Sequence, residues 1–171
     1  MRILGVDPGS RAAGWAVVSF EGPPRLVAAG VLRPPTTTSF ALRLLALHDG
    51  LLAIAERERP DEAAVEQVFS GVNPQSLITL GEARGVLLLA LARASIPVSE
   101  VTPAEIKKTV TGTGQADKEQ VRRMVHSLLG TPAGGPRRTS SCSASRATVV
   151  RLTPTARAPH RRWTRASPVT G

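Results

Sequence analysis

Residues 1–10 read MRILGVDPGS, and this opening stretch predicts the strand around which the other elements are arranged. The apolar run Ile3 to Val6 predicts a short strand, and the turn after it, Asp7-Pro8-Gly9-Ser10, has proline and glycine in favoured positions. We therefore expect Asp7 at the carboxyl end of the first strand. We expect no signal peptide, because Asp7 and Pro8 interrupt the apolar run.

The remaining elements are predicted outward from this strand. Apolar runs at 14–20 and 26–32 predict two more strands that form an antiparallel group with the first. Helical spacing and caps predict helices over 39–59, 74–94, 103–110 and 116–129, with strands at 62–66 and 96–101. This order predicts an α/β domain, a mixed sheet flanked by helices, with the fourth strand parallel and adjacent to the first.

Two carboxylates are expected at one edge of this sheet. Asp7 ends the first strand and Glu66 ends the fourth, and ligand sites in open α/β sheets lie beyond the carboxyl ends of the strands. Carboxylates brought close together repel each other and favour a bound cation, and hard oxygen ligands select Mg²⁺, with Mn²⁺ as the alternative ion. The competing interpretation is that Asp7 only shapes a turn and Glu66 is a solvated strand end.

The positive charge of the chain is concentrated at one end. The net charge is +9, but residues 131–171 hold eight arginines and no lysine, aspartate or glutamate, so this segment alone carries +8. Such a tail attracts nucleic acid without choosing a sequence. We predict a folded domain over 1–130 and a basic, disordered tail over 131–171.

The cysteine content and the apolar runs suggest where the protein works. Cys142 is the single cysteine, so no intramolecular disulfide can form, which suits a reducing cytoplasmic compartment. The longest apolar run, 86–92, is far shorter than the roughly 20 residues needed to span a bilayer. We therefore expect a cytoplasmic protein with no membrane partner.

Four ordered motifs resemble one known family. They are Gly5-Val6-Asp7-Pro8-Gly9-Ser10 followed by Gly14, Val65-Glu66-Gln67-Val68-Phe69, Leu80-Gly81-Glu82-Ala83-Arg84-Gly85, and Ile106-Lys107-Lys108 followed by the stretch 113–121. Their order and spacing over about residues 1–130 resemble the RuvC family of Holliday-junction resolvases. The resemblance implies a ribonuclease-H-like fold and a Mg²⁺-dependent endonuclease that cleaves Holliday junctions symmetrically in homologous recombination and DNA repair.

The resemblance also implies roles for particular residues. Asp7 and Glu66 would ligate the catalytic metal ions, and Lys107 and Lys118 would complete the catalytic set beside the scissile phosphate. Phe69 would stack on bases at the junction centre, and Lys108 would contact the DNA backbone. The alternatives are a core aromatic for Phe69 and solvated helix lysines for the three basic residues.

Partners are implied in the same way. The apolar helix from Leu77 to Ala94 resembles the family's dimer helix, and a two-fold dimer suits a four-way junction with two-fold symmetry. The alternative is that this helix packs only on its own sheet. The resemblance further implies a branch-migration helicase complex as a partner.

The sequence departs from the family at its carboxyl end. The family ends in a helix with two aspartates that complete the metal site, whereas no acidic residue follows Glu119 here, and we expect the final helix to be missing. Out-of-frame translation of the tail is one hypothesis, and the reading frames near codon 130 would test it. A second possibility is a protein of the same fold that binds junctions without cutting them.

A third class of function is an actin-like phosphate-binding protein. Such proteins also use an Asp-x-Gly turn, which the stretch 7–10 offers. A chain of 171 residues lacks the second domain that those ATPases need, and ATP binding would be the observation in its favour.

Overall fold

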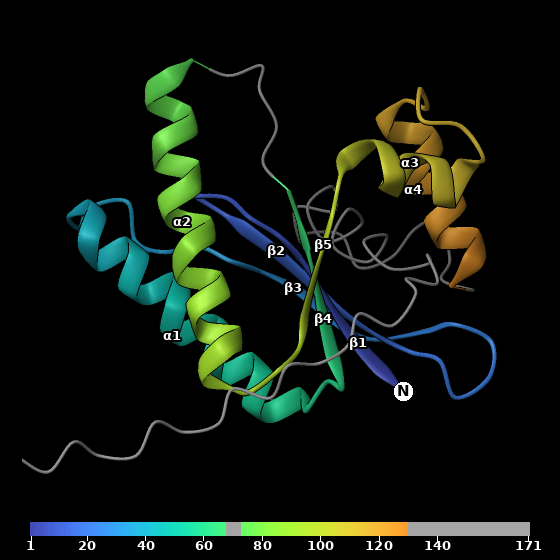
Figure 1. Ribbon diagram of the computed structural model, residues 1–171, viewed down its shortest axis with the longest axis horizontal. Helices are drawn as coiled ribbons and strands as arrows, with labels where there is room; N and C mark the ends of the chain where they lie inside the picture. The colour runs from blue at the N-terminus through green and yellow to red at the C-terminus, as the bar shows by residue number, and fades with distance from the viewer. Residues whose placement is uncertain (68–72, 130–171) are drawn as a thin grey trace, which may run out of the picture.

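The computed structural model describes residues 1–67 and 73–129. Figure 1 shows a central sheet with helices packed beside it. The elements in chain order are β1 (Arg2–Asp7), β2 (Ala13–Ser19), β3 (Arg25–Leu32), α1 (Phe40–Glu58), β4 (Glu62–Glu66), α2 (Pro74–Arg93), β5 (Val98–Val101), α3 (Pro103–Thr111) and α4 (Lys118–Leu128).

The sheet is mixed, as the sequence predicts. Its strand order is β3-β2-β1-β4-β5. The first three strands run antiparallel, and β4 runs parallel to both β1 and β5. Helices α1 and α2 provide the crossovers that parallel neighbours require. The predicted adjacency of the first and fourth strands is confirmed.

Helices cover the sheet on two faces with separate cores. Alternate strand residues such as Leu4, Val6 and Val65 pack against α1 and α2 in the larger core. Ala64, which faces the other way because strand side chains alternate, packs with Val101 and the apolar faces of α3 and α4. Figure 1 shows α1 with α2 and α3 with α4 as two separate helical groups beside the sheet.

Most element boundaries lie within one residue of the sequence prediction, and two elements begin two residues later than predicted, for local reasons. Helix α4 begins at Lys118 rather than Ala116, because the side chain of Asp117 accepts hydrogen bonds from the backbone N–H groups of Glu119 and Gln120 and caps the helix there. Strand β5 begins at Val98 rather than Ile96, directly after Pro97, a residue type that has no N–H to donate to a sheet.

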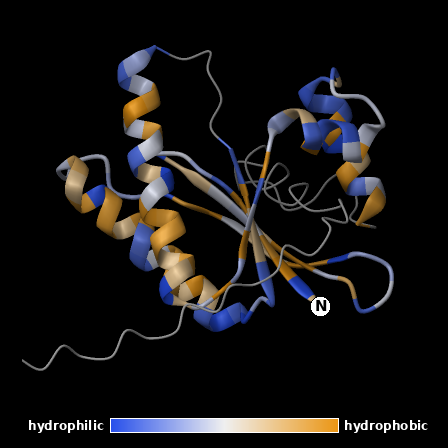
Figure 2. Ribbon diagram, viewed as in Figure 1, coloured by the Kyte–Doolittle hydropathy of each residue, from blue (hydrophilic) through white to orange (hydrophobic). Residues whose placement is uncertain are grey.

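Helix α2 is unusually apolar. Among the described residues it is the one helix long and apolar enough, by composition, to cross a membrane. Its buried residues, Ala83, Leu87, Ala90 and Leu91, belong to the larger core together with residues of α1. Figure 2 shows much of α1 and α2 in the hydrophobic colour, whereas α3 and the start of α4 are more hydrophilic.

Three expectations lie outside the described residues. Phe69 falls in the gap between residues 67 and 73, and the missing final family helix and the disordered tail both concern residues after 129.

Candidate active site at the ends of two parallel strands

Asp7 and Glu66 are the last residues of neighbouring strands. The parallel register pairs Val6 with Val65, so the two carboxylate residues follow at the next position of each strand. Neighbouring strands lie about 4.8 Å apart. The two acids are therefore brought to one edge of the sheet, as the sequence predicts.

Both acids belong to the same face of the sheet. Val6 and Val65 pack in the core beneath α1 and α2, so their successors in the strands face the opposite side. Glu66 is only 4% exposed, and it lies across from Val101 in the register of β4 and β5. This is the face on which α3 and α4 pack, because Val101 and Ala64 belong to their core.

The turn after Asp7 is compact, and a side chain from helix α1 is hydrogen-bonded to it. Strand β1 ends at Asp7 and β2 begins at Ala13, which leaves residues 8–12 as the connection between them. A Cβ at Gly9 would lie 2.2 Å from the carbonyl oxygen of Ala12, so this position requires glycine. Nη2 of Arg43, on α1, donates a 2.7 Å hydrogen bond to the carbonyl oxygen of Ser10. The sequence gives no sign of this contact, because Arg43 has only the spacing of a polar helix residue.

Lys107 and Lys108 are presented by a well-capped helix. Thr102 and Glu105 form a reciprocal capping box at the start of α3. Hydrogen bonds from the backbone and then the hydroxyl of Thr102 hold the pKa of Glu105 below its ordinary value. Lys107 is half-buried and Lys108 is exposed.

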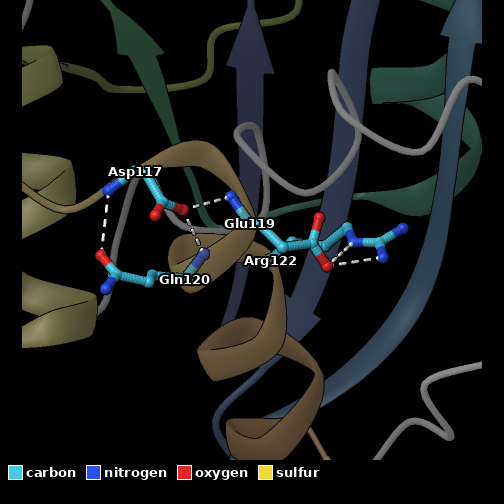
Figure 3. A network of polar contacts seen from close by, with 4 residues as sticks. All are labelled: Asp117, Glu119, Gln120 and Arg122. Atoms are coloured by element: carbon cyan, nitrogen blue, oxygen red, sulfur yellow. Dashed lines mark hydrogen bonds and ion pairs between the residues drawn. The ribbon is translucent and has the colours of Figure 1, made fainter.

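Lys118 is the first residue of α4, and its position is fixed by the cap shown in Figure 3. Oδ1 of Asp117 accepts hydrogen bonds of 2.8 Å from the backbone N–H groups of Glu119 and Gln120. Oε1 of Gln120 accepts in return from the backbone N–H of Asp117 at 3.0 Å, and Arg122 pairs with Glu119 at 2.7 Å. The acids near Lys118 are therefore occupied by the backbone and by Arg122.

The three lysines remain available for an anion. Within 1–67 and 73–129, no ion pair to Lys107, Lys108 or Lys118 is present. Because α3 and α4 pack on the face that carries Glu66, the helices that bear these lysines and the carboxylates share one side of the sheet. Such a surface can hold a metal ion with its acids and a phosphate with its bases.

The donor set in the described chain consists of two acids. Within the residues that the structure describes, there is no group of three or more His, Cys, Asp or Glu side chains able to hold a metal. Mg²⁺ is commonly bound by one or two carboxylates, with waters and substrate phosphates completing its coordination. Asp7 and Glu66 therefore fit a Mg²⁺ ion that takes its other ligands from water and substrate.

The mixed five-stranded sheet, with acids at the ends of adjacent central strands, defines a ribonuclease-H-like protein. Residues 3–148 match the family described as Crossover junction endodeoxyribonuclease RuvC. The chain belongs to this RuvC family.

Individual relatives agree with this assignment. A crossover junction endodeoxyribonuclease RuvC from Chloroflexus aurantiacus is 50% identical over 131 residues, which are 76% of this chain and 80% of the relative. The protein of the same name from Caulobacter vibrioides is 45% identical over 150 residues, 87% of each chain.

A solved structure agrees with the fold. The structure of Thermus thermophilus RuvC in complex with Holliday junction substrate has a TM-score of 0.79 and 30% identity, covering 88% of this chain and 90% of that one. The fold class expected from the sequence is confirmed.

Proposed function

We propose that this chain is a structure-selective endonuclease that cleaves Holliday junctions symmetrically during homologous recombination and DNA repair. The observation that carries the proposal is the pair Asp7 and Glu66 at matched ends of adjacent parallel strands, in a chain of the RuvC family. Relatives named crossover junction endodeoxyribonuclease, and the structure of one such protein with a Holliday junction, support the same activity here.

Asp7 and Glu66 would hold Mg²⁺, or Mn²⁺ in its place. When bound, the ion supplies an activated water and stabilises the leaving oxygen of the phosphodiester. The protein's own part is to hold both carboxylates in a fixed orientation. The burial of Glu66 at a strand end supports this role, because a nearly inaccessible side chain has few alternative positions.

Lys107 and Lys118 would complete the catalytic set by contacting the scissile phosphate and its neighbours, and Lys108 would contact the backbone further away. Ammonium groups that have no ion pair within the described part of the chain suit this role, since phosphate contacts supply much of the affinity for DNA. Phe69, which lies outside the described residues, would stack on unpaired bases at the junction centre.

A homodimer would form through the exposed face of α2. Ile78 and Leu89 are 57% and 54% exposed on this face, and no atom of the described residues lies within 4 Å of a Cβ built at Gly81 or Gly85. Apolar and small residues at helical spacing allow two helices to approach closely. A two-fold dimer would present two active sites to the two-fold symmetric junction.

The rest of the chain fits the same proposal. Residues 1–130 would form the nuclease domain, and the basic segment 131–171 would add sequence-independent attraction to DNA. We place the protein in the cytoplasm, where a branch-migration helicase complex would be its partner.

The activity is tested with a synthetic four-way junction and a linear duplex of the same sequence. We expect paired nicks in opposing strands of the junction with Mg²⁺, no nicks with EDTA, and little cleavage of the duplex. Cleavage of both DNAs at equal rates would refute the structure selectivity.

A second candidate function is junction binding without cleavage. The absence of acids after Glu119 and the two-carboxylate donor set of the described residues favour it. A junction band that shifts on a native gel, with no nicks in either Mg²⁺ or Mn²⁺, would identify this function.

A further inference from the structure

The side chain of Arg43 connects helix α1 to the turn that follows Asp7. Arg43 lies at the start of α1, and its hydrogen bond to the carbonyl oxygen of Ser10 spans 33 residues of sequence. The bond length of 2.7 Å is typical of a charge-assisted hydrogen bond. The contact therefore ties a helix on one face of the sheet to the turn at the end of β1.

The guanidinium group is constrained on its other sides as well. Its Cζ lies 5.6 Å from the centroid of the Phe40 ring, within the range of a cation–π interaction. Its Nε is buried and has no hydrogen-bond partner among the described residues. A buried N–H without a partner is unfavourable and offsets much of what one hydrogen bond contributes. Stability alone therefore does not explain why an arginine occupies this position.

Because the turn is compact, a contact that fixes Ser10 also limits the backbone position of Asp7. Residues 8–13 connect the paired residues Asp7 and Gly14, and the backbone at Gly9 lies tightly against Ala12. Such a compact turn has little room to deform internally. Fixing the carbonyl of Ser10 therefore limits where the backbone after Asp7 can lie, and with it the direction of the carboxylate.

We propose that Arg43 is a positioning residue that holds the β1–β2 turn so that Asp7 meets the metal and the phosphate in one orientation. This inference rests on the proposed role of Asp7 as a metal ligand. Residues that orient a ligand without touching the metal typically contribute about 10–100-fold to metal affinity or activity.

The test uses the full chain with Arg43→Met, which keeps the length and apolar stem of the side chain but removes its donors. Arg57→Met is the matched control, since Arg57 is an exposed arginine on the same helix. Four quantities are measured: Mn²⁺ affinity by electron paramagnetic resonance, the single-turnover cleavage rate, the junction dissociation constant, and the melting temperature. Arg43→Lys tests whether a cationic donor at this position restores function.

We expect Arg43→Met to weaken Mn²⁺ binding and slow cleavage by about 10-fold or more, with the junction dissociation constant and melting temperature close to those of Arg57→Met. Arg43→Lys should recover part of both losses, because an ammonium can donate to the same carbonyl. Hydrogen exchange at residues 9–12 should accelerate in Arg43→Met even without metal.

The inference is overturned if Arg43→Met keeps Mn²⁺ affinity and cleavage within about two-fold of Arg57→Met, where a positioning role predicts much more. It is equally overturned if the loss of Mn²⁺ affinity and cleavage is accompanied by a lower melting temperature than that of Arg57→Met, since that result indicates a structural role. Asp7→Asn in the same assay distinguishes a failure of the proposed metal ligand from a failure of the positioning role of Arg43. If Asp7→Asn leaves Mn²⁺ affinity unchanged, the proposed metal ligand is wrong; if only Arg43→Met leaves it unchanged, the fault lies with Arg43.

Discussion

At the residue scale, the conformation of the turn after Asp7 depends on the absence of a side chain at Gly9. A Cβ at this position would lie 2.2 Å from the carbonyl oxygen of Ala12, which is backbone and cannot rotate away. Gly9→Ala should therefore displace the turn after Asp7 and destabilise the fold by about 1–3 kcal/mol, the usual cost of overpacking. Denaturant unfolding measures the stability, and junction cleavage should fall with it although no carboxylate has been removed.

Gly114→Ala is the control for this substitution. The atom nearest to a Cβ built at Gly114 is the carbonyl oxygen of Ala104, at an ordinary contact distance of 3.8 Å, and replacing a glycine by alanine where the backbone permits it stabilises a protein by about 0.4–1 kcal/mol. Stability should stay the same or rise. Equal stability of Gly9→Ala and the wild type would contradict the tight turn.

Glu105 gives the residue-scale prediction for pH. Because hydrogen bonds from Thr102 lower the pKa of Glu105 in the folded state, its contribution to stability is present above the unfolded-state pKa and is lost as pH falls through the lower folded pKa. Glu105→Gln should remove this component. The difference in unfolding free energy between wild type and variant should therefore shrink in acid, and the change should be small because the group is exposed and screened by solvent.

The measurement is urea unfolding at a series of pH values between neutrality and mild acid. A difference that grows in favour of the wild type as pH falls would have the wrong sign and would contradict the cap.

At the residue scale, the sequence predicts the positions of the two site carboxylates but not the long-range hydrogen bond that Arg43 makes. Asp7 and Glu66 are predictable because each directly follows an apolar strand run, and the topology then makes them neighbours. Arg43 is not predictable, because its partner is a backbone carbonyl 33 residues away that leaves no trace in the residue types. The roles of Lys107, Lys108, Lys118 and Phe69 stay predictions.

At the scale of elements, α2 has one buried face and one exposed apolar face, and the exposed face is the proposed dimer interface. Its buried face packs in the core with α1, and its outer face exposes Ile78 and Leu89 around two glycines. Gly85→Arg should place a charge on the outer face without a clash inside the subunit. We expect a monomer by light scattering, an unchanged helical circular dichroism spectrum, and unpaired single-strand nicks in place of paired ones.

Leu45→Arg is the matched control for the dimer prediction. Leu45 is a similarly exposed apolar residue, at 53%, on the neighbouring helix α1. This variant should remain a dimer. A dimeric Gly85→Arg protein would contradict the assignment of the α2 face.

Element order is predictable here, whereas element ends depend on single atoms. Apolar periodicity predicts, in their correct order, the nine helices and strands found in the described residues. The side chain of Ser39 caps the start of α1. The start of α4 moves to Lys118 because one carboxylate oxygen of Asp117 captures two backbone N–H groups, as Figure 3 shows. Periodicity averages over a turn or more and does not register such a local bond.

At the scale of the whole molecule, we expect the non-specific attraction to DNA and the cleavage site to lie in different parts of the chain. Residues 131–171 carry +8 of the net charge of +9, whereas the carboxylates and the three lysines lie within residues 1–130. A chain ending at residue 130 should bind linear duplex more weakly and with a shallower salt dependence, because each lost phosphate contact lowers the slope by about 0.9. Filter binding at several salt concentrations measures this slope, and an unchanged slope would show that the basic segment makes no phosphate contacts.

The central claim is that Asp7 and Glu66, at matched strand ends, perform the cutting but not the recognition. The most direct measurement compares wild type, Asp7→Asn and Glu66→Gln on one labelled four-way junction in Mg²⁺, with nicks and band shifts recorded from the same samples. Both variants keep the side-chain size and remove one charge. We predict paired nicks for the wild type and at least about 100-fold slower cleavage for each variant, because each variant removes one proposed metal ligand. Junction affinity should be retained, because the substitution lowers the negative charge that faces the DNA phosphates. Cleavage by either variant at the wild-type rate would contradict the claim.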